Sequence, residues 1–411
     1  MTFDIFDLSL ELKKSLEKNN YKTPTPIQNE VIPLVKTKKD IMAQAKTGSG
    51  KTASFVIPIL EDLKDKKTSK KEKAKIKVLV LAPTRELTLQ IADTFLNFSE
   101  YFAHKPSVVS LIGGEKIGEQ LLKIQKGCDI VVATAGRLID IIGKKQIDLS
   151  NLEYFVLDEA DKMLDLGFVD ELDEILKTIP NQRQNLMFSA TYPQKVIDIV
   201  SKISKNAIKV QIEESSTNVE QITQRAIFVN KVDRSELLRV LIKQNKFKSI
   251  LVFVGTKRAA DNISNKFRKK GFKADSFHGD LTQEERVYTL DDFKNKDIQI
   301  LFSTDIAARG LHIDDIDCVV NFDLPRSSED YIHRIGRTAR AGKTGVAISF
   351  LDNENLEHFK LIEKRYKLNI PKEQIEGFDF TLIKSTKEKG KAPVKGKRKS
   401  KKDKLREQNT K

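Results

Sequence analysis

The sequence predicts an α/β protein with two tandem domains, each built on a doubly wound, mostly parallel sheet. Short apolar runs alternate with longer helix-like segments in both halves, as in strands joined by crossover helices. The runs are apolar at successive positions, as in strands buried on both faces of a sheet. At 411 residues the chain is long enough for two cores of ordinary size.

Nine apolar runs are the strand candidates. They are residues 40–43, 76–81, 130–133, 155–157 and 185–188 in the first half, and 250–254, 298–302, 318–322 and 346–350 in the second. Polar residues 213–218 between the halves predict a linker, and basic residues 64–77 predict a surface loop. We therefore expect a first domain at 1–211, a linker at 212–223, a second domain at 224–383 and a tail at 384–411.

The positive charge is concentrated at the C-terminus. The net charge is +15, and residues 384–411 supply +10 of it with 13 Lys/Arg and 3 Asp/Glu. A segment this poor in large apolar residues cannot offset its chain entropy by burial, so we expect disorder. Such a tail suits phosphate backbones through counterion release. The alternative is a solubilising end without a specific partner.

The composition argues against membrane, secreted and metal-cluster proteins. No apolar run is long enough to span a bilayer, and the charged N-terminus lacks the apolar core of a signal peptide. Cys128 and Cys318 are the only cysteines and show no metal-ligand spacing. We expect both to pack as small apolar side chains in a reducing, cytoplasmic setting without a membrane partner.

A phosphate-binding loop is predicted at residues 45–52. It reads Ala45-Lys46-Thr47-Gly48-Ser49-Gly50-Lys51-Thr52 and lies between a strand candidate and an apolar run that can form a helix. Its glycines let backbone N–H groups approach phosphate oxygens, and the helix N-terminus adds positive charge. Lys51 is expected to reach the β- and γ-phosphates of ATP, and Thr52 to ligate Mg²⁺. Ala45 stands where Gly is usual.

Two carboxylates, Asp158 and Glu159, follow the apolar run at 155–157. In an open α/β sheet, ligands bind at the carboxyl ends of the strands. Asp158 is placed to hold Mg²⁺, partly through water, and Glu159 to orient and deprotonate the attacking water. Positioning and charge stabilisation are most of what phosphoryl transfer requires from a protein.

These motifs resemble the DEAD-box RNA helicases of helicase superfamily two, a family named for the sequence Asp158-Glu159-Ala160-Asp161. The resemblance covers roughly residues 3–380. It implies two RecA-like domains, ATP and Mg²⁺ as cofactors, and RNA as partner. The ending Ile375-Glu376-Gly377-Phe378 before a basic tail is most similar to the bacterial RhlE-type branch.

Contacts to the nucleoside are implied by the same resemblance. Residues 21–28, within an expected Q motif at 4–32, place Gln28 to pair with adenine through one donor and one acceptor. Tyr21 is similar to the aromatic that stacks on the base, and Phe6 to an upstream aromatic. Gly310 and His312 match the ribose contact, where His312 replaces a usual Asp. We expect His312 to weaken ATP affinity modestly.

The second half is implied to complete the ATP site. Arg337 and Arg340 resemble arginine fingers that meet the γ-phosphate when the domains close, and on a helix they would face the same way. Ala339 between them replaces a usual Gly. The residues implied to couple ATP to RNA are Asp161, Ser189, Thr191, His333 and Arg334.

An RNA track is implied in both domains. Its residues are Pro83, Thr84, Arg85, Gly113, Gly114, Thr134 and Arg137 in the first domain, and Thr256, Gln283, Arg286 and Thr304 in the second. Such groups bind phosphate and sugar oxygens without a sequence code, and 2′-hydroxyl contacts distinguish RNA from DNA. Ala135 replaces a usual Pro in this track and loses its fixed φ.

The resemblance implies RNA-stimulated ATP hydrolysis, coupled to interdomain closure and to local unwinding of short RNA duplexes or remodelling of RNA–protein complexes. Two alternatives stay open: an ATP-gated RNA clamp with little unwinding, and a DNA translocase of the same superfamily. Glu159 and the two fingers favour turnover over a clamp, and the Q motif argues against a DNA translocase. The sequence does not choose between ribosomal and RNA-decay assemblies as partners.

Overall fold

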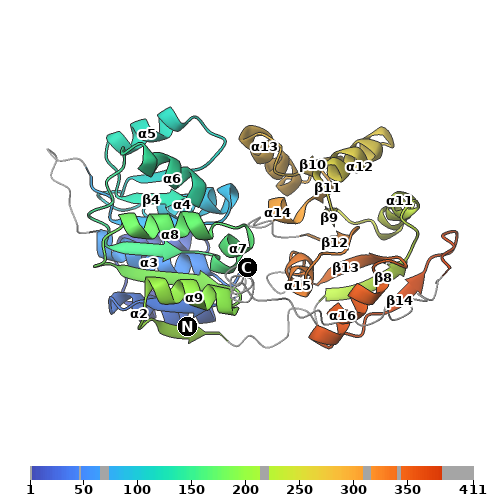
Figure 1. Cartoon of the computed structure of the whole chain (residues 1–411), viewed down its shortest axis with the longest axis horizontal. Helices are drawn as coiled ribbons and strands as arrows, with labels where there is room; N and C mark the ends of the chain where they lie inside the picture. The colour runs from blue at the N-terminus through green and yellow to red at the C-terminus, as the bar shows by residue number, and fades with distance from the viewer. Residues whose placement is uncertain are drawn as a thin grey trace, which may run out of the picture.

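The protein folds into two α/β domains that lie side by side (Figure 1). The computed structural model describes residues 2–45, 48–64, 74–212, 222–308, 316–339 and 344–381. Much of the predicted surface loop and linker, and all of the predicted tail, lie outside these ranges. Within these ranges, no helix combines the length and apolar character needed to cross a membrane.

The first domain is built on a parallel sheet with strand order β3-β4-β2-β5-β6-β1-β7. Its strands are β1 Ile41–Gln44, β2 Val78–Leu81, β3 Val108–Leu111, β4 Ile130–Ala133, β5 Tyr154–Leu157, β6 Gln184–Ser189 and β7 Ile208–Gln211. Its helices are η1 Phe3–Phe6, α1 Leu10–Lys18, α2 Pro26–Lys36, α3 Lys51–Leu63, α4 Arg85–Phe98, α5 Ile117–Gln125, α6 Ala135–Gly143, α7 Ala160–Asp165, α8 Val169–Thr178 and α9 Gln194–Ile203.

The second domain repeats this topology with strand order β10-β11-β9-β12-β13-β8-β14, again parallel. Its strands are β8 Ile222–Phe228, β9 Ile250–Phe253, β10 Ala274–Phe277, β11 Ile300–Ser303, β12 Cys318–Asn321, β13 Gly345–Leu351 and β14 Lys372–Gln374. Its helices are α11 Arg234–Asn245, α12 Lys257–Lys269, α13 Gln283–Lys294, α14 Asp305–Ala308, α15 Ser328–Ile335 and α16 Leu356–Tyr366.

Continuous apolar runs form the central strands because both faces of each sheet are covered by helices. In β2, Val78 and Val80 pack into the apolar cluster on one face, and Leu79 and Leu81 into the cluster on the other. Every residue of β2 is buried. The prediction of doubly wound parallel sheets is confirmed.

Five strands escaped prediction: β3, β7, β8, β10 and β14. They carry exposed or polar positions, as in β7 and β14 at the sheet edges, so their sequences lack a continuous apolar run. β8 begins at Ile222, inside the segment predicted as a linker.

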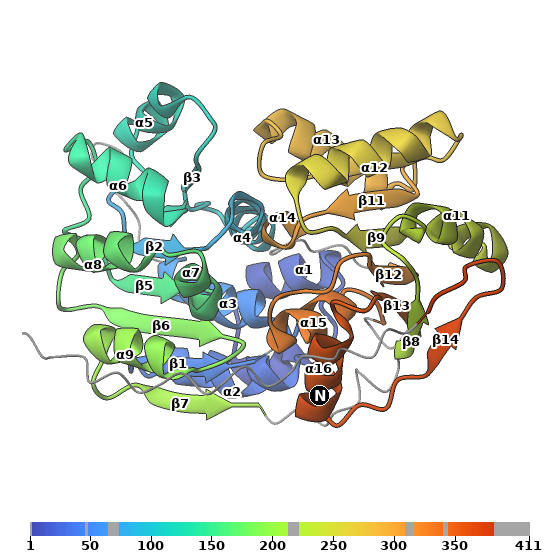
Figure 2. The same cartoon turned by 45° about the vertical axis from the view of Figure 1, so that its right-hand side comes forward.

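The order of strands places three sequence motifs next to one another. β1, β6 and β5 are neighbours in the sheet, and the phosphate-binding loop, the Ser189 segment and the Asp158 segment follow their carboxyl ends. Parallel strands end at the same edge, so these segments meet there. Figure 2 shows this edge of the first domain turned toward α14 and α15 of the second.

Candidate active site and RNA-binding edge

The phosphate-binding loop is a tight turn from β1 into α3. Gly48 and Gly50 have φ of 86° and 93°, a region that favours glycine. Lys51 opens α3, is buried, and donates from Nζ to the carbonyl of Ala45 at 2.8 Å. Thr52 follows in the first turn, and Thr47 lies outside the described residues. This turn fits a phosphate cradle because backbone N–H groups and one ammonium converge at a helix N-terminus.

Gln28 ties the predicted Q motif to this loop. Its Oε1 accepts from the Thr25 N–H at 2.9 Å, and its Nε2 donates to the Gly50 carbonyl at 3.1 Å. A Cβ at position 50 would lie 2.4 Å from Gln28 Nε2, so this approach requires glycine. The side chain that we expect to read adenine is thus buried beside the loop that we expect to hold the phosphates.

The two predicted aromatic contacts lie in the apolar packing of the first domain. Phe6 is buried against Phe3, with ring centroids 5.9 Å apart. Tyr21 packs edge-on against Phe98 at 5.0 Å, and burial raises the pKa of its phenol. Both aromatics therefore contribute to the position of the Q motif.

Asp158 and Glu159 are buried at the end of β5. The Glu159 N–H donates to Asp158 Oδ1 at 2.9 Å, and Glu159 has φ of 52°, an uncommon value for a residue with a side chain. Burial raises the pKa of Asp158 to about 6. Burial also opposes ionisation of Glu159, but the cations of Lys162 and Lys51 outweigh it and lower the pKa of Glu159.

The cation beside Glu159 is Lys162, one turn later on α7. Its Nζ donates to Glu159 Oε1 at 2.5 Å, and both side chains are almost fully buried. Burial lowers the pKa of Lys162, and the nearby guanidinium of Arg337 from the second domain adds to this effect. Glu159 therefore lies in a site to which both domains contribute charge.

Asp161, Ser189 and Thr191 form one hydrogen-bonded unit. Asp161 Oδ2 accepts from the Thr191 N–H at 2.9 Å and from its hydroxyl at 3.0 Å. Ser189 Oγ donates to the Thr191 carbonyl at 2.6 Å and accepts from the Asp161 N–H at 3.3 Å. These hydrogen bonds therefore join the acidic segment after β5 to the segment after β6.

Arg334 holds α15 against the second sheet. It forms a bidentate pair with Asp305 at 2.6 and 2.7 Å and donates to Asn321 and to the Asp323 carbonyl. Its guanidinium lies 4.7 Å from the ring centroid of Phe253. Arg334 is thus occupied within its own domain.

His333 and Arg337 reach toward the first domain. Both line a small cavity that Lys162 of the first domain also lines. Burial lowers the pKa of His333, with a further contribution from the charge of Lys162. Residues predicted for the ATP site are therefore contributed by both domains at this boundary.

The helical placement expected for the arginine fingers is wrong for Arg337. α15 ends at Ile335, and Arg337 lies in the turn that follows. Thr338 pairs with Ile316 in a β-bridge and donates from its hydroxyl to the Ile316 carbonyl, which draws the chain out of the helix. Arg340, Gly310 and His312 lie outside the described residues.

The predicted RNA residues of the first domain gather at helix N-termini. Thr84 caps α4 and accepts from the Leu87 N–H at 3.3 Å, with Pro83 before it. Thr134 precedes α6, and Arg137 on that helix donates to Gln120 at 3.0 Å. Arg85 lies against Gly113 and Gly114, and a Cβ at position 114 would lie 2.4 Å from its Nη1.

The second domain presents the same arrangement. Thr256 caps α12 and accepts from the Ala259 N–H at 3.1 Å, and Gln283 opens α13. Thr304 follows β11, with its N–H directed at the Phe277 carbonyl at 3.4 Å. Parallel strands followed by helices thus place hydroxyls and N–H groups along one edge of each sheet, where they can bind phosphate oxygens.

Arg286 joins the two sheet edges that carry the predicted RNA contacts. Its Nε donates to Glu86 Oε1 of the first domain at 2.6 Å, and both side chains are about nine-tenths buried. Its guanidinium lies 4.5 Å from the ring centroid of Phe277. Burial lowers the pKa of Arg85, and the charge of Arg286 adds to this effect.

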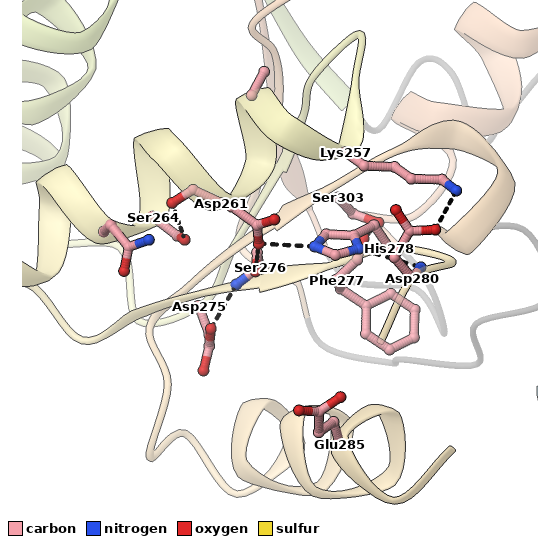
Figure 3. A network of polar contacts seen from close by, with 12 residues as sticks. Lys257, Asp261, Ser264, Asp275, Ser276, Phe277, His278, Asp280, Glu285 and Ser303 are labelled. Carbon is pink, nitrogen blue, oxygen red and sulfur yellow. Dashed lines mark hydrogen bonds and ion pairs between the residues drawn. The ribbon is translucent and has the colours of Figure 1, made fainter. Parts of the chain in front are cut away.

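Arg286 also contacts the backbone of His278, whose side chain belongs to the polar network in Figure 3. Asp261 Oδ1 accepts from Ser276 Oγ at 2.6 Å and contacts His278 Nε2 at 2.7 Å. The Asp280 N–H donates to His278 Nδ1 at 3.3 Å, which assigns the other ring nitrogen as donor to Asp261. Arg286 Nη1 in turn donates to the His278 carbonyl at 3.0 Å.

Sequence reasoning assigned no role to Lys162 or His278, and it placed Glu86 in the RNA-contact motif at residues 83–87 without predicting its contact with the second domain. Lys162 lies three residues after Glu159, a helical spacing that indicates contact. Glu86 gave no comparable signal, because its partner is 200 residues away in the chain. His278 follows β10, a strand too short and polar to be predicted.

The donor set fits a magnesium nucleotide. Within the described part of the chain, no group of three or more His, Cys, Asp or Glu side chains could hold a metal ion. Thr52 and Asp158 would supply an alcohol and a carboxylate and leave the other positions to phosphate and water, as Mg²⁺ prefers.

The structure contains two repeated parallel α/β domains. The first carries the phosphate-binding loop and the acidic box, and an arginine of the second domain lies beside them. Together these features define a tandem RecA-like nucleoside triphosphatase. The family model described as DEAD/DEAH box helicase matches residues 25–199, and the model of the helicase conserved C-terminal domain matches residues 233–342. The chain belongs to the DEAD-box ATP-dependent RNA helicases.

Bacterial relatives support this assignment over most of the chain. CshA of Bacillus subtilis, a DEAD-box ATP-dependent RNA helicase, is 37% identical over 367 residues, which cover 89% of this chain and 73% of that protein. RhpA of Helicobacter pylori is 37% identical over 382 residues, covering 93% and 75% of the two chains. These relatives establish the family but not the predicted RhlE-type branch.

Solved structures share the arrangement of both domains. The DEAD-box helicase Mss116 bound to single-stranded RNA and UDP-BeF matches with a TM-score of 0.81 and 29% identity, covering 92% of this chain and 80% of that one. Saccharomyces cerevisiae Dbp5 bound to RNA and ADP-BeF3 matches with a TM-score of 0.79 and 30% identity, covering 91% and 95%. The protein is an ATP-hydrolysing RNA helicase that uses ATP with Mg²⁺ and binds RNA.

Proposed function

We propose that the protein separates short RNA duplexes locally, without sequence preference, in a cycle of domain closure and reopening. The observation that carries this proposal is the pair of interdomain contacts. The charge of Arg337 acts on the buried Glu159 site, and Arg286 pairs with Glu86 at the RNA-binding edge. These interactions support binding of ATP and of RNA across the same domain boundary, so that each would favour the closed arrangement.

The roles of the site residues follow from their surroundings. Glu159 orients and deprotonates the attacking water, because its carboxylate is kept ionised by Lys162 and Lys51. Lys51, Arg337 and Arg340 stabilise charge on the phosphates. Bound Mg²⁺ would neutralise phosphate charge, with Thr52 and Asp158 as its protein ligands.

ATP hydrolysis is coupled to RNA through the segments after β5 and β6. Asp161 connects the acidic box to Ser189 and Thr191. His333 lies near the same box, and Arg334 supports it from within α15. If the two domains failed to close on RNA, the residues that hold the attacking water would therefore be affected.

An ATP-gated clamp is the second candidate. The favouring observation is the buried Lys162–Glu159 pair, which occupies one oxygen of the catalytic carboxylate. Turnover is the stronger proposal, because Glu159 and Arg337 are both present and close enough for their charges to interact.

The cellular setting is also a proposal. We place the protein in the cytoplasm of a bacterium, acting on ribosomal or RNA-decay assemblies. The support is the bacterial origin of relatives such as CshA and RhpA. The ending at residues 375–378 and the basic tail support an RhlE-type member.

The deciding experiment is ATP hydrolysis with and without single-stranded RNA, with single-stranded DNA and Glu159→Gln as controls. Stimulation by RNA alone that Glu159→Gln abolishes supports the coupled cycle, and unwinding of a short duplex is tested next. Turnover that RNA does not stimulate would contradict it. ATP-dependent RNA retention without turnover would support the clamp.

A further inference from the structure

Outside the C-terminal tail and the basic residues 64–77, positive charge gathers in one segment of the second domain. Residues 243–273 contain ten Lys/Arg and one Asp/Glu, a net charge of +9. The rest of the chain before the tail is therefore net negative, because the tail carries +10 of the total of +15. Most of this segment is α12 and the ends that flank it.

One side of α12 is neutralised by its own domain. Lys257 pairs with Asp280 at 2.5 Å, and Arg268 pairs with Asp275 at 2.9 Å. Asp261 on the same side contacts Ser276 and His278 (Figure 3). The cations on this side have a structural role.

The opposite exposed side carries cations that lack such partners. Arg258, Asn262, Lys266 and Lys270 follow at intervals of four residues, and Lys269 lies beside them, so they share one helical surface. All five are exposed. Across the described residues, no carboxylate forms an ion pair with any of the four cations. We call Arg258, Lys266, Lys269 and Lys270 the α12 basic row.

Helix stability alone does not explain this row. Cations in the last turn interact favourably with the helix dipole by a few tenths of a kcal/mol. Arg258, however, lies in the first turn, where the dipole opposes a cation, and like charges at four-residue spacing destabilise a helix. The row thus has one cation in the first turn and three at the end of the helix, about 12 Å further along, so it can contact phosphates at both ends of α12.

The row starts at the RNA-binding edge and leads away from it. Thr256, which caps α12, is a predicted RNA contact, and α12 extends about 20 Å from it. α12 lies along the outer upper edge of the second domain in both views (Figures 1 and 2). Arg239 of α11 packs 5.8 Å from the Phe267 ring centroid, so α11 lies beside α12, and α11 carries a further exposed cation, Lys243.

We propose that the α12 basic row binds the part of the RNA that leaves the cleft at the second domain. This inference rests on the proposed RNA path across the two sheet edges. The row would contact phosphates of a duplex arm or continuing strand, without reading bases. It would hold the flanking RNA while the cleft separates the strands, and so favour substrates longer than the cleft.

The test compares two variants with the same change in charge. The first replaces Arg258, Lys266, Lys269 and Lys270 by Gln. The matched control replaces Lys177, Lys195, Lys205 and Lys209 by Gln, four exposed lysines of the first domain. Each full-length variant is titrated with a short single strand that fills only the cleft, and with the same strand extended by a duplex arm, over a range of salt.

The row variant is expected to bind the extended RNA about tenfold more weakly than the control variant, with its log–log salt slope reduced by about 3 for four lost phosphate contacts. Affinity for the short strand and kcat at saturating RNA are expected to match the control. Equal affinity of both variants for the extended RNA would overturn the inference.

An equal loss on the short strand would also overturn it, because the row would then act through the cleft or the fold. Matching thermal unfolding of the two variants separates these causes. If neither RNA stimulates the wild-type ATPase, the proposed function fails first and the inference fails with it. Stimulation of the wild type by the short strand, with no difference between the variants on the extended RNA, removes the row alone.

Discussion

The Glu86–Arg286 pair gives the sharpest test of coupling between the domains. It joins α4 of the first domain to α13 of the second at 2.6 Å, and only 11% and 8% of the two side chains are exposed. Arg286 is also held by the His278 carbonyl. The perturbations are Glu86→Gln, Arg286→Gln and the double variant.

The two single changes differ in cost. Arg286→Gln leaves a buried carboxylate without its cation and also removes the bond to the His278 carbonyl, for which we expect about 3 kcal/mol. Glu86→Gln leaves Arg286 with the His278 carbonyl and with RNA phosphates, for which we expect about 1.5 kcal/mol. These costs correspond to losses of about 150-fold and about tenfold in kcat/KM for RNA-stimulated hydrolysis.

The assay is steady-state ATP hydrolysis at fixed salt over a range of RNA concentration, with ATP affinity without RNA as the control. If the pair links the domains, the double variant loses less than the two single variants together, by about 1.5 kcal/mol. Additive losses would refute the reasoning, since they would show that each residue acts on RNA independently. An unchanged Glu86→Gln enzyme would refute it more directly.

Three further predictions concern single sites. In steady-state kinetics, His278→Ala should raise the KM for RNA severalfold and leave the KM for ATP unchanged. His278→Gln keeps a donor for Asp261 and should restore part of the loss. Equal effects on both KM values would mean a general folding defect. Calorimetry should show Mg²⁺–ATP binding weakening as pH falls below about 6, because burial raises the pKa of Asp158 to about 6 and a protonated carboxyl is a poor Mg²⁺ ligand; binding independent of pH between 5 and 8 would contradict this. Burial raises the pKa of the Cys128 thiol to about 12 and also raises that of Cys318. Mass spectrometry should therefore find neither cysteine alkylated in the native protein at pH 8 and both alkylated after unfolding. Rapid alkylation of the native protein would contradict the packing.

The sequence predicted the central strands well, because a strand that is buried on both faces has apolar residues at successive positions. β4 has the bounds predicted for it, and β2, β5 and β6 lie within one or two residues of theirs. Edge strands are harder to predict because they lack a continuous apolar run. In β7, for example, Lys209 and Gln211 are exposed to solvent. Period and apolarity therefore predict the interior of a sheet better than its edges.

The individual motifs of the candidate site were predicted, but the contacts between the two domains were not. The phosphate-binding loop and Asp158 were recognisable because each carries its own local pattern. The Glu86–Arg286 pair depends on how two domains meet, and no local pattern encodes that. Arg337 shows the converse error, because helical spacing was assumed where the Thr338 bridge ends the helix.

The charges around the acidic box suggest how nucleotide binding would favour domain closure in the proposed cycle. Glu159 is under the influence of Lys162 and Lys51 from its own domain and of Arg337 from the other. The like charges of Arg337 and Lys51 help to lower the pKa of Lys162, so the three cations repel one another in a buried space. A bound nucleotide brings several negative charges to this space and would relieve that repulsion. After hydrolysis and phosphate release, fewer negative charges remain between Lys51 and Arg337, and their repulsion favours separation of the domains. In the proposed cycle, the buried cations that we expect to stabilise the phosphates would thus also make the closed arrangement dependent on ATP.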